Sequence, residues 1–162
     1  MTDMMRKLVL PVLMLFAVPA AAEMMVSDAR IMLGIGERPG VMHGIIMNHG
    51  AADTALIGAD SPAFQRIELH THEKSPDGMM RMRQVEAFAL PQHGSVKLAP
   101  RGDHLMLFGF RGKTGDVVSV TLHFADAPST QLEVATKARK KRDNHKGGHH
   151  KGGHKDMGHK GH

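Results

Sequence analysis

The stretch Arg66–His72 (RIELHTH) alternates between polar and apolar side chains along its whole length. A period of two is typical of a β-strand, because successive strand side chains point to opposite faces. Ile67 and Leu69 are therefore expected to face an apolar core. The polar side chains Glu68, His70 and His72 share the opposite face.

A second alternating stretch, His104–Leu107, places two leucines on one face and His104 with Met106 on the other. At a rise of about 3.3 Å per residue, these two side chains start about 6.6 Å apart, so they can converge on one ion. Methionine is also a common filler of cores. Because the leucines take the opposite face here, the pattern favours a ligand role for Met106.

The region around these stretches is predicted to be all-β. Short segments with alternation or β-branched residues recur between turn signals rich in Gly, Pro and Asp, and no window shows a clean helical stripe. Roughly seven or eight short strands fit a sandwich or a Greek-key barrel. The expected strands are Ala29–Leu33, Val41–Met47, Gln65–His72, Met79–Phe88, Ser95–Leu98, Leu105–Phe110 and Val117–Phe124.

The amino-acid composition limits the kinds of functional site that the protein can contain. The chain has 162 residues, which is enough for one domain with appendages. It has no cysteine, which excludes disulfides, thiolate metal sites, blue-copper centres and cysteine nucleophiles. Its 14 methionines and 13 histidines favour copper, because thioether sulfur is a soft ligand and imidazole suits copper as well. No Ser/His/Asp arrangement is evident in the sequence, so an enzyme is not expected.

Residues 1–22 are predicted to be a signal peptide. Arg6 and Lys7 form a charged start, Leu8–Val18 is an apolar run of 11 residues, and Ala20-Ala21-Ala22 supplies the small residues of a cleavage site. The apolar run is too short to cross a bilayer comfortably. Cleavage after Ala22 would release the protein into the periplasm without stable membrane insertion.

Several further stretches carry a resemblance to a known family: Glu68-Leu69-His70, Asp77-Gly78-Met79-Met80-Arg81-Met82-Arg83, Leu90-Pro91 and Leu98–Leu107. Residues 28–136 resemble the periplasmic copper chaperone family PCu(A)C, whose pattern is His-x10-Met-x21-His-x-Met. The resemblance implies a cupredoxin-like Greek-key β-sandwich over residues 23–138. It also implies a copper(I) site formed by His70, Met82, His104 and Met106.

The resemblance further implies a partner. A chaperone of this family delivers copper towards cytochrome c oxidase assembly, so the acceptor is expected to be a copper-inserting assembly protein or an oxidase subunit. Two imidazoles and two neutral thioethers favour copper(I) over zinc. Two alternatives stay open: a periplasmic copper buffer that serves tolerance, and a basic-tailed surface-binding module.

The spacing departs from the family pattern at one place. His70 and Met82 are separated by 11 residues rather than ten, and the extra residue falls within the loop at 73–78, where an insertion costs little. His72 and Met82 are separated by nine residues, which fits no better. His70 is favoured because it follows Glu68-Leu69, and His72 is left as an auxiliary ligand. Met79 or Met80 could take the place of Met82.

The segment 139–162 is a low-complexity tail rich in Gly, His and Lys, and it is expected to be disordered without metal. It holds eight basic and two acidic side chains, whereas the body is nearly neutral. Nucleic-acid binding would have to rest on the tail alone and is not expected. Gly-spaced imidazoles suit copper(II). The predicted tail ligands are His145, His149, His150, His154, Met157, His159 and His162.

Overall fold

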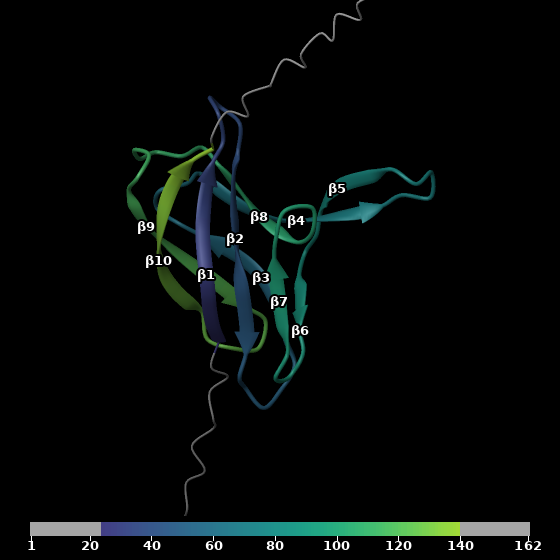
Figure 1. Cartoon of the computed structure of the whole chain (residues 1–162). Helices are drawn as coiled ribbons and strands as arrows, with labels where there is room; N and C mark the ends of the chain where they lie inside the picture. Colours follow the sequence, from purple (N-terminus) through teal and green to yellow (C-terminus); the bar gives the residue numbers. More distant parts are fainter. Residues whose placement is uncertain (1–23, 140–162) are drawn as a thin grey trace, which may run out of the picture.

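The computed structural model describes residues 24–139, and within that range it contains ten strands and no helix (Figure 1). The prediction of an all-β fold is therefore confirmed. The strands are β1 Met24–Leu33, β2 Gly40–Asn48, β3 Thr54–Asp60, β4 Arg66–Lys74, β5 Met80–Gln84, β6 Phe88–Leu90, β7 Ser95–Leu98, β8 His104–Phe108, β9 Val117–Phe124 and β10 Thr130–Ala138.

The strands form one continuous hydrogen-bonded path in the order β5-β4-β8-β2-β1-β10-β9-β3-β6, and β7 pairs with β2 beside β8. Strand β10 joins the two layers of this path. Its first part, Thr130–Ala135, pairs antiparallel with β9, and its last part, Thr136–Ala138, pairs parallel with β1. The path thereby curls around an apolar interior, and β3 comes to lie against β4.

The core lies between the layers and is built from alternate residues of each strand. In β2 every second residue from Gly40 to Asn48 is buried, as in a strand with one face on the core. Each fully buried aliphatic side chain contributes about 1.5–3 kcal/mol of transfer free energy. The most buried apolar side chains are Ile31, Met42, Ile46, Leu56, Leu90, Leu105, Leu107, Val120, Leu122 and Val134.

The strand predictions near β1, β3 and β10 differ from the structure. Strand β1 begins at Met24 rather than Ala29, because a register shift between Ser27 and Arg30, with Asp28 at φ 53°, interrupts the alternation. Strand β3 was not predicted, since a similar register shift between Leu56 and Gly58 breaks its pattern. Strand β10 was not predicted either, although buried Val134 and Thr136 alternate with exposed neighbours.

The expected single strand Met79–Phe88 is in fact two strands in different layers. Strand β5 pairs with β4, whereas β6 pairs with β3, and the chain crosses between them at residues 85–87. At the crossing the backbone N–H of Val85 donates to the carbonyl of Leu69, 2.9 Å away. Phe88 is then buried on the opposite layer, and this burial holds the crossing in place.

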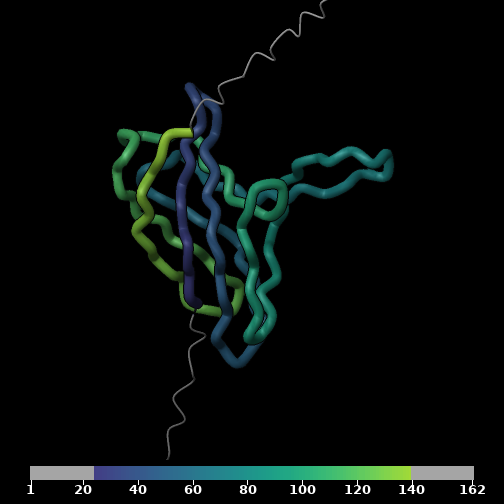
Figure 2. The backbone as a smooth tube through the Cα atoms, viewed as in Figure 1, coloured from purple at the N-terminus to yellow at the C-terminus, as the bar shows by residue number. Residues whose placement is uncertain are grey.

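The outer parts of β4 and β5 form a hairpin that projects from the body (Figure 2). Its turn spans Ser75–Met79, where the Ser75 N–H donates to the Met79 carbonyl at 2.8 Å and Gly78 takes φ 83°. On one face of the hairpin Arg83 donates two hydrogen bonds to Glu73. The hairpin therefore stays ordered outside the main core.

The predicted signal peptide at 1–22 and the predicted metal-binding tail lie outside the described residues, apart from Arg139. In the part of the chain that the structure covers, no helix is long and apolar enough to cross a membrane.

Candidate metal site

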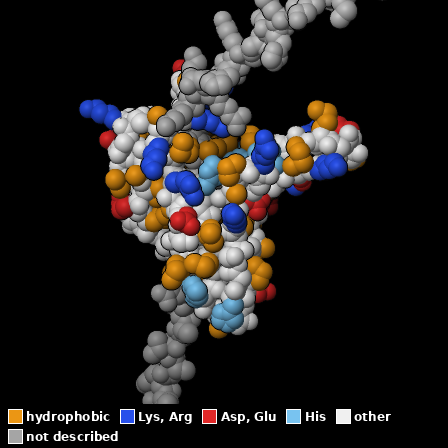
Figure 3. Space-filling model, viewed as in Figure 1, with side chains coloured by type: hydrophobic (Ala, Val, Ile, Leu, Met, Phe, Trp, Pro, Cys, Tyr) orange, Lys and Arg blue, Asp and Glu red, His pale blue; other side chains and the backbone are white. Residues whose placement is uncertain are grey.

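The pairing of β4 with β8 brings the two predicted histidine ligands face to face. His70 is directly opposite His104, and Glu68 is directly opposite Met106. Between them Leu69 is paired with Leu105, and both leucines are buried in the core. His70, His104, Glu68 and Met106 therefore share one face of the sheet. Figure 3 shows histidine side chains at this place, where the projecting hairpin meets the body.

His104 is held in one ring orientation and is almost fully buried, with 3% of its surface exposed. Its Nδ1–H donates to the carbonyl of Gly102 at 2.9 Å, which assigns the proton to Nδ1. The loop between β7 and β8 supplies this carbonyl and is itself closed by a bond from the Ala99 N–H to the Asp103 carbonyl. The Nε2 lone pair of His104 is therefore left for a ligand.

His70 carries the opposite arrangement. Its Nε2–H donates to the Glu68 carboxylate at 2.9 Å, so the lone pair lies on Nδ1. That Nδ1 is buried and has no hydrogen-bond partner within residues 24–139. A buried polar atom without a partner costs about 1–3 kcal/mol. A metal ion bound at Nδ1 would remove this cost, so the residue fits a ligand role.

His72 lies beside the same cluster. The centre of its ring is 5.2 Å from that of His104, whereas the ring of His70 is 6.1 Å away. Its Nδ1 is 3.5 Å from the Gly102 carbonyl, which is at the outer limit of a hydrogen bond. The structure thus places His70 and His72 both within reach of His104, and the two differ in the partners of their ring nitrogens.

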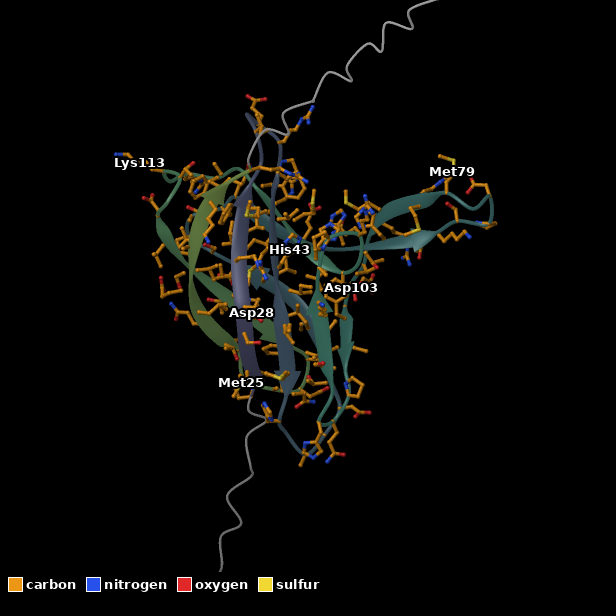
Figure 4. All side chains as sticks on the ribbon, in the orientation of Figure 1. Met25, Asp28, His43, Met79, Asp103 and Lys113 are labelled. Atoms are coloured by element: carbon orange, nitrogen blue, oxygen red, sulfur yellow. The ribbon has the colours of Figure 1, made fainter. Side chains whose placement is uncertain are left out.

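The two predicted methionine ligands sit in different surroundings. Met106 is buried with 9% of its surface exposed, whereas Met82 is 46% exposed on the edge strand β5, directly opposite His72. Met79 and Met80 are still more exposed and lie nearer the tip of the hairpin, where Figure 4 labels Met79. Met82 would therefore have to fold inward over His72 to join the other ligands.

Sulfur is essential to this arrangement. Among the described residues, no group of three His, Cys, Asp or Glu side chains could hold a metal ion. Two imidazoles with methionine sulfur form a neutral, soft ligand set. Such a set suits a monovalent copper ion better than a divalent cation that needs carboxylates.

His43 is a neighbour that the sequence analysis missed. It lies on β2 opposite Arg30, and the register that pairs Val41 with Met106 brings it next to His104 (labelled in Figure 4). Burial lowers the pKa of His43, and the nearby His104 and Arg30 lower it further. The alternation of β2 could have placed His43 on this face.

The electrostatic environment of His104 also favours the neutral imidazole, which is the form that binds a metal ion. Burial lowers the pKa of His104, the Gly102 bond opposes this in part, and the charges of His72 and His70 lower the pKa again. The hydrogen bond from Arg66, followed by that from His70, lowers the pKa of Glu68. At neutral pH His104 is therefore neutral and Glu68 is ionised.

Two hollows in the described surface do not contain the four predicted ligands. The larger, of about 770 Å³, lies at the end of the sandwich near Ile35 and Phe108. The smaller, of about 280 Å³, borders the candidate site and is lined by His43, Arg30 and Lys97. The candidate ligands thus line neither of these hollows, and His70, His104 and Met106 share the face of the sheet that is opposite to the core.

One exposed hydrogen-bonded group of Asp, His and Ser was not evident in the sequence. Asp60, His123 and Ser129 do come together: His123 bonds Asp60 through Nε2 and Ser129 through Nδ1, the latter at 2.9 Å. Sequence patterns missed the triad because its members come from β3, β9 and the following turn. All three lie on an exposed surface, and none of them lines either hollow.

Comparison with known proteins places the chain in a family. A sequence model described as "Putative lipoprotein LpqE-like" matches residues 24–136. The chain is also 31% identical over 97 residues to a protein of Leifsonia xyli subsp. xyli (strain CTCB07) named "Putative lipoprotein". That alignment covers 58% of each protein, so the chain spans somewhat over half the length of this relative.

Solved structures give the same fold. The copper-bound PCuAC domain from PmoF2 is similar with a TM-score of 0.60 and 21% identity, covering 74% of this chain and 97% of that one. CuI-DR1885 from Deinococcus radiodurans, solved in solution, has a TM-score of 0.56 and 26% identity, covering 73% and 81%. The resemblance to PCu(A)C proteins is thus confirmed, and over residues 24–136 the chain belongs to the LpqE-like family.

Proposed function

We propose that this protein is an exported copper carrier that binds copper(I) through His70, Met82, His104 and Met106. The observation that carries the proposal is the pairing of His70 with His104 across β4 and β8, with the ring centres 6.1 Å apart. The His70 Nδ1 is buried without a partner, and the His104 Nε2 is left free by the bond to Gly102. Copper(I) is the ion best matched to imidazole and thioether together.

Similar proteins support this assignment. One structural neighbour is a copper-bound PCuAC domain, and another, at 26% identity, is described as the Cu(I) form of its protein. Neutral ligands that lie outside the apolar core can release an ion to a partner, which a carrier requires. The family described as lipoprotein-like supports export, with residues 1–22 acting as a signal peptide cleaved after Ala22 and the periplasm as the destination.

The site is tested by anaerobic titration with a chromophoric copper(I) chelator as competitor. Met106→Leu and His104→Ala should weaken copper(I) binding strongly, and the first change preserves side-chain volume, so the fold should survive. Met79→Leu, at the hairpin tip, is the matched methionine control and should leave the affinity unchanged. Unchanged affinity in the Met106→Leu, His104→Ala double variant would overturn the assignment.

The choice between the two β4 histidines is tested in the same assay. His70→Ala should cost more copper(I) affinity than His72→Ala, because only His70 has a buried ring nitrogen without a partner. The reverse order would assign the ligand position to His72, which lies directly opposite Met82.

The destination of the copper follows from the PCu(A)C resemblance: delivery towards cytochrome c oxidase, through an assembly protein or an oxidase subunit. A buffer that serves copper tolerance would bind the ion equally well without releasing it to such an acceptor. Transfer of copper(I) to a purified oxidase subunit separates the two, since a buffer would retain its copper at equal concentrations of both proteins.

The tail at 139–162 is proposed to collect copper(II) through its histidines. Several imidazoles on a glycine-spaced chain suit copper(II), whereas the body set suits the reduced ion. The alternative is a basic segment that binds an anionic surface through charge alone. Such binding weakens steeply with added salt, and coordination hardly responds to it.

A further inference from the structure

We propose a second copper(I) site at the other end of the same sheet face, formed by Met25, Met47, His49 and His93. It goes beyond the carrier site proposed above and does not depend on it. The second set contains the same residue types, two methionines and two histidines, drawn from β1, β2, the loop after β2 and the turn before β7.

The two methionines form a cross-strand pair. Met25 on β1 is directly opposite Met47 on β2, which brings their Cβ atoms to about 4.5–5.5 Å. Met25 is 47% exposed and Met47 is half-buried, so neither fills the core. Figure 4 labels Met25 at the end of the sheet where β1 begins. Two thioethers are thus presented together to solvent.

The two histidines stand one step further along the same ladder. Met47 is paired with Ser95, and the N–H of Asn48 donates to the Gly94 carbonyl at 2.9 Å, which continues that register. The next position sets His49 against His93. His49 is two residues beyond Met47, about 6.6 Å along the strand, which is the spacing that separates His104 from Met106.

A buried asparagine fixes the two histidine-bearing segments relative to each other. The Asn48 side chain, 1% exposed, donates to the carbonyls of Ala52, Leu90 and Pro91. Its Oδ1 accepts from the Gly50 N–H at 2.9 Å. The amide thereby ties the loop after β2 to the turn before β7. A metal site gains affinity when its ligands are held in place before the ion arrives.

The histidine-bearing turn is also rigid. The N–H of Gly94 donates to the Pro91 carbonyl at 2.8 Å, and His93 takes a left-handed φ of 56°. Both histidines are exposed, and within residues 24–139 no side-chain hydrogen bond engages either ring. Figure 3 shows histidine side chains next to hydrophobic ones at this end of the molecule.

The ligand types of the second site determine which metal ion it prefers. All four side chains are neutral when the imidazoles are unprotonated, and two of them are soft thioethers, so the set prefers copper(I) to zinc or calcium. The site is separate from the first one: Met47 follows His43, the neighbour of His104, by four residues, or about 13 Å along β2. One ion cannot bridge that distance.

Methionine methyl NMR on the full-length chain tests the site. With 13C-methyl methionine, copper(I) is added anaerobically, and signals are assigned by single Met→Leu variants. The Met25 and Met47 signals should shift together, and they should do so equally in Met106→Leu, which disables the first site. In His49→Ala, His93→Ala the affinity read from the Met25 signal should fall by about tenfold or more. Met79, exposed on the hairpin, is the control signal.

The possible results of this experiment distinguish the second site from the carrier site. Stationary Met25 and Met47 signals, while Met106 responds, would overturn the second site and leave the first intact. Shifts of undiminished affinity in the double histidine variant would also overturn it, because the methionine pair would then bind without the histidines. Stationary Met82 and Met106 signals would count against the carrier site alone.

Discussion

Glu68 should control the copper affinity of the carrier site without touching the ion. Its carboxylate accepts hydrogen bonds from Arg66 at 2.7 Å and from the His70 Nε2–H at 2.9 Å, and its side chain is 21% exposed. The second bond holds the proton on Nε2 and aims Nδ1 away from solvent. In Glu68→Ala the His70 ring can rotate and exchange tautomers, so the Nδ1 lone pair is no longer held in position to bind the metal ion.

The expected loss is about tenfold in copper(I) affinity, the lower end of the 10–100-fold range for partners that orient a ligand. The lower end applies because the backbone of His70 stays paired with that of His104 after the carboxylate is gone. Tenfold corresponds to about 1.4 kcal/mol. The apo protein should lose less than about 1 kcal/mol of unfolding free energy, since the ion pairs of Glu68 are partly exposed.

Competitive titration against a copper(I) chelator measures the affinity, and thermal unfolding of the apo form measures the stability. Glu73→Ala is the matched control, because Glu73 lies on the same strand and accepts two hydrogen bonds from Arg83 away from the histidines. Equal copper(I) affinity in Glu68→Ala and Glu73→Ala would refute the role assigned to Glu68, and with it the use of His70 Nδ1.

Three further predictions concern stability, pH and the tail. Leu105→Ala removes a side chain with 0% exposure directly behind the site and should cost about 2–5 kcal/mol in chemical unfolding; a cost below 1 kcal/mol would contradict its core position. Burial lowers the pKa of His104 and of His43 below 6.5 in the folded apo protein, so the stability they confer is full above about pH 6.5 and is lost as the pH falls. Thermal unfolding measured from pH 7.5 to pH 5 should show this loss of stability, and the loss should be smaller in His43→Gln. An identical pH profile in the two proteins would count against the contribution of His43. Deleting residues 139–162 should abolish most copper(II) uptake at neutral pH and spare copper(I) binding, as measured by metal content after dialysis at two salt concentrations; equal uptake by both forms would leave the tail merely basic.

Local patterns in the sequence were enough to predict the strand faces at the site. The alternation in Arg66–His72 and His104–Leu107 correctly assigned the leucines to the core and the histidines to the opposite face. Pairing between distant strands could not be predicted this way. That His70 faces His104 depends on the register of β4 against β8, which no local pattern encodes.

The errors arose where tertiary structure breaks the period of two. The bulge at Asp28 hid the first residues of β1, and the register shift after Leu56 hid β3. The continuous segment Met79–Phe88 concealed a change of layer, because an edge strand and a buried strand follow one another there. The role of His43 was missed because it depends on the register of β2 against β8. Glu68 was placed on the face of His70, but its hydrogen bond to that ring was not predicted.

Strand β10 imposes an order on how this domain can be completed. The parallel partners of Ile31–Leu33 are Thr136–Ala138, more than a hundred positions later in the chain. A nascent or partly translocated polypeptide that lacks its last strand leaves the parallel edge of β1 open and the interior between the layers unsealed. Pairing of strands so distant in the sequence slows folding, because the chain must lose conformational entropy to close the loop before the pairing contributes any stability. The β4–β8 pairing that carries the histidines is complete by Phe108, so the proposed metal ligands of these two strands can come together before the rest of the domain closes around them.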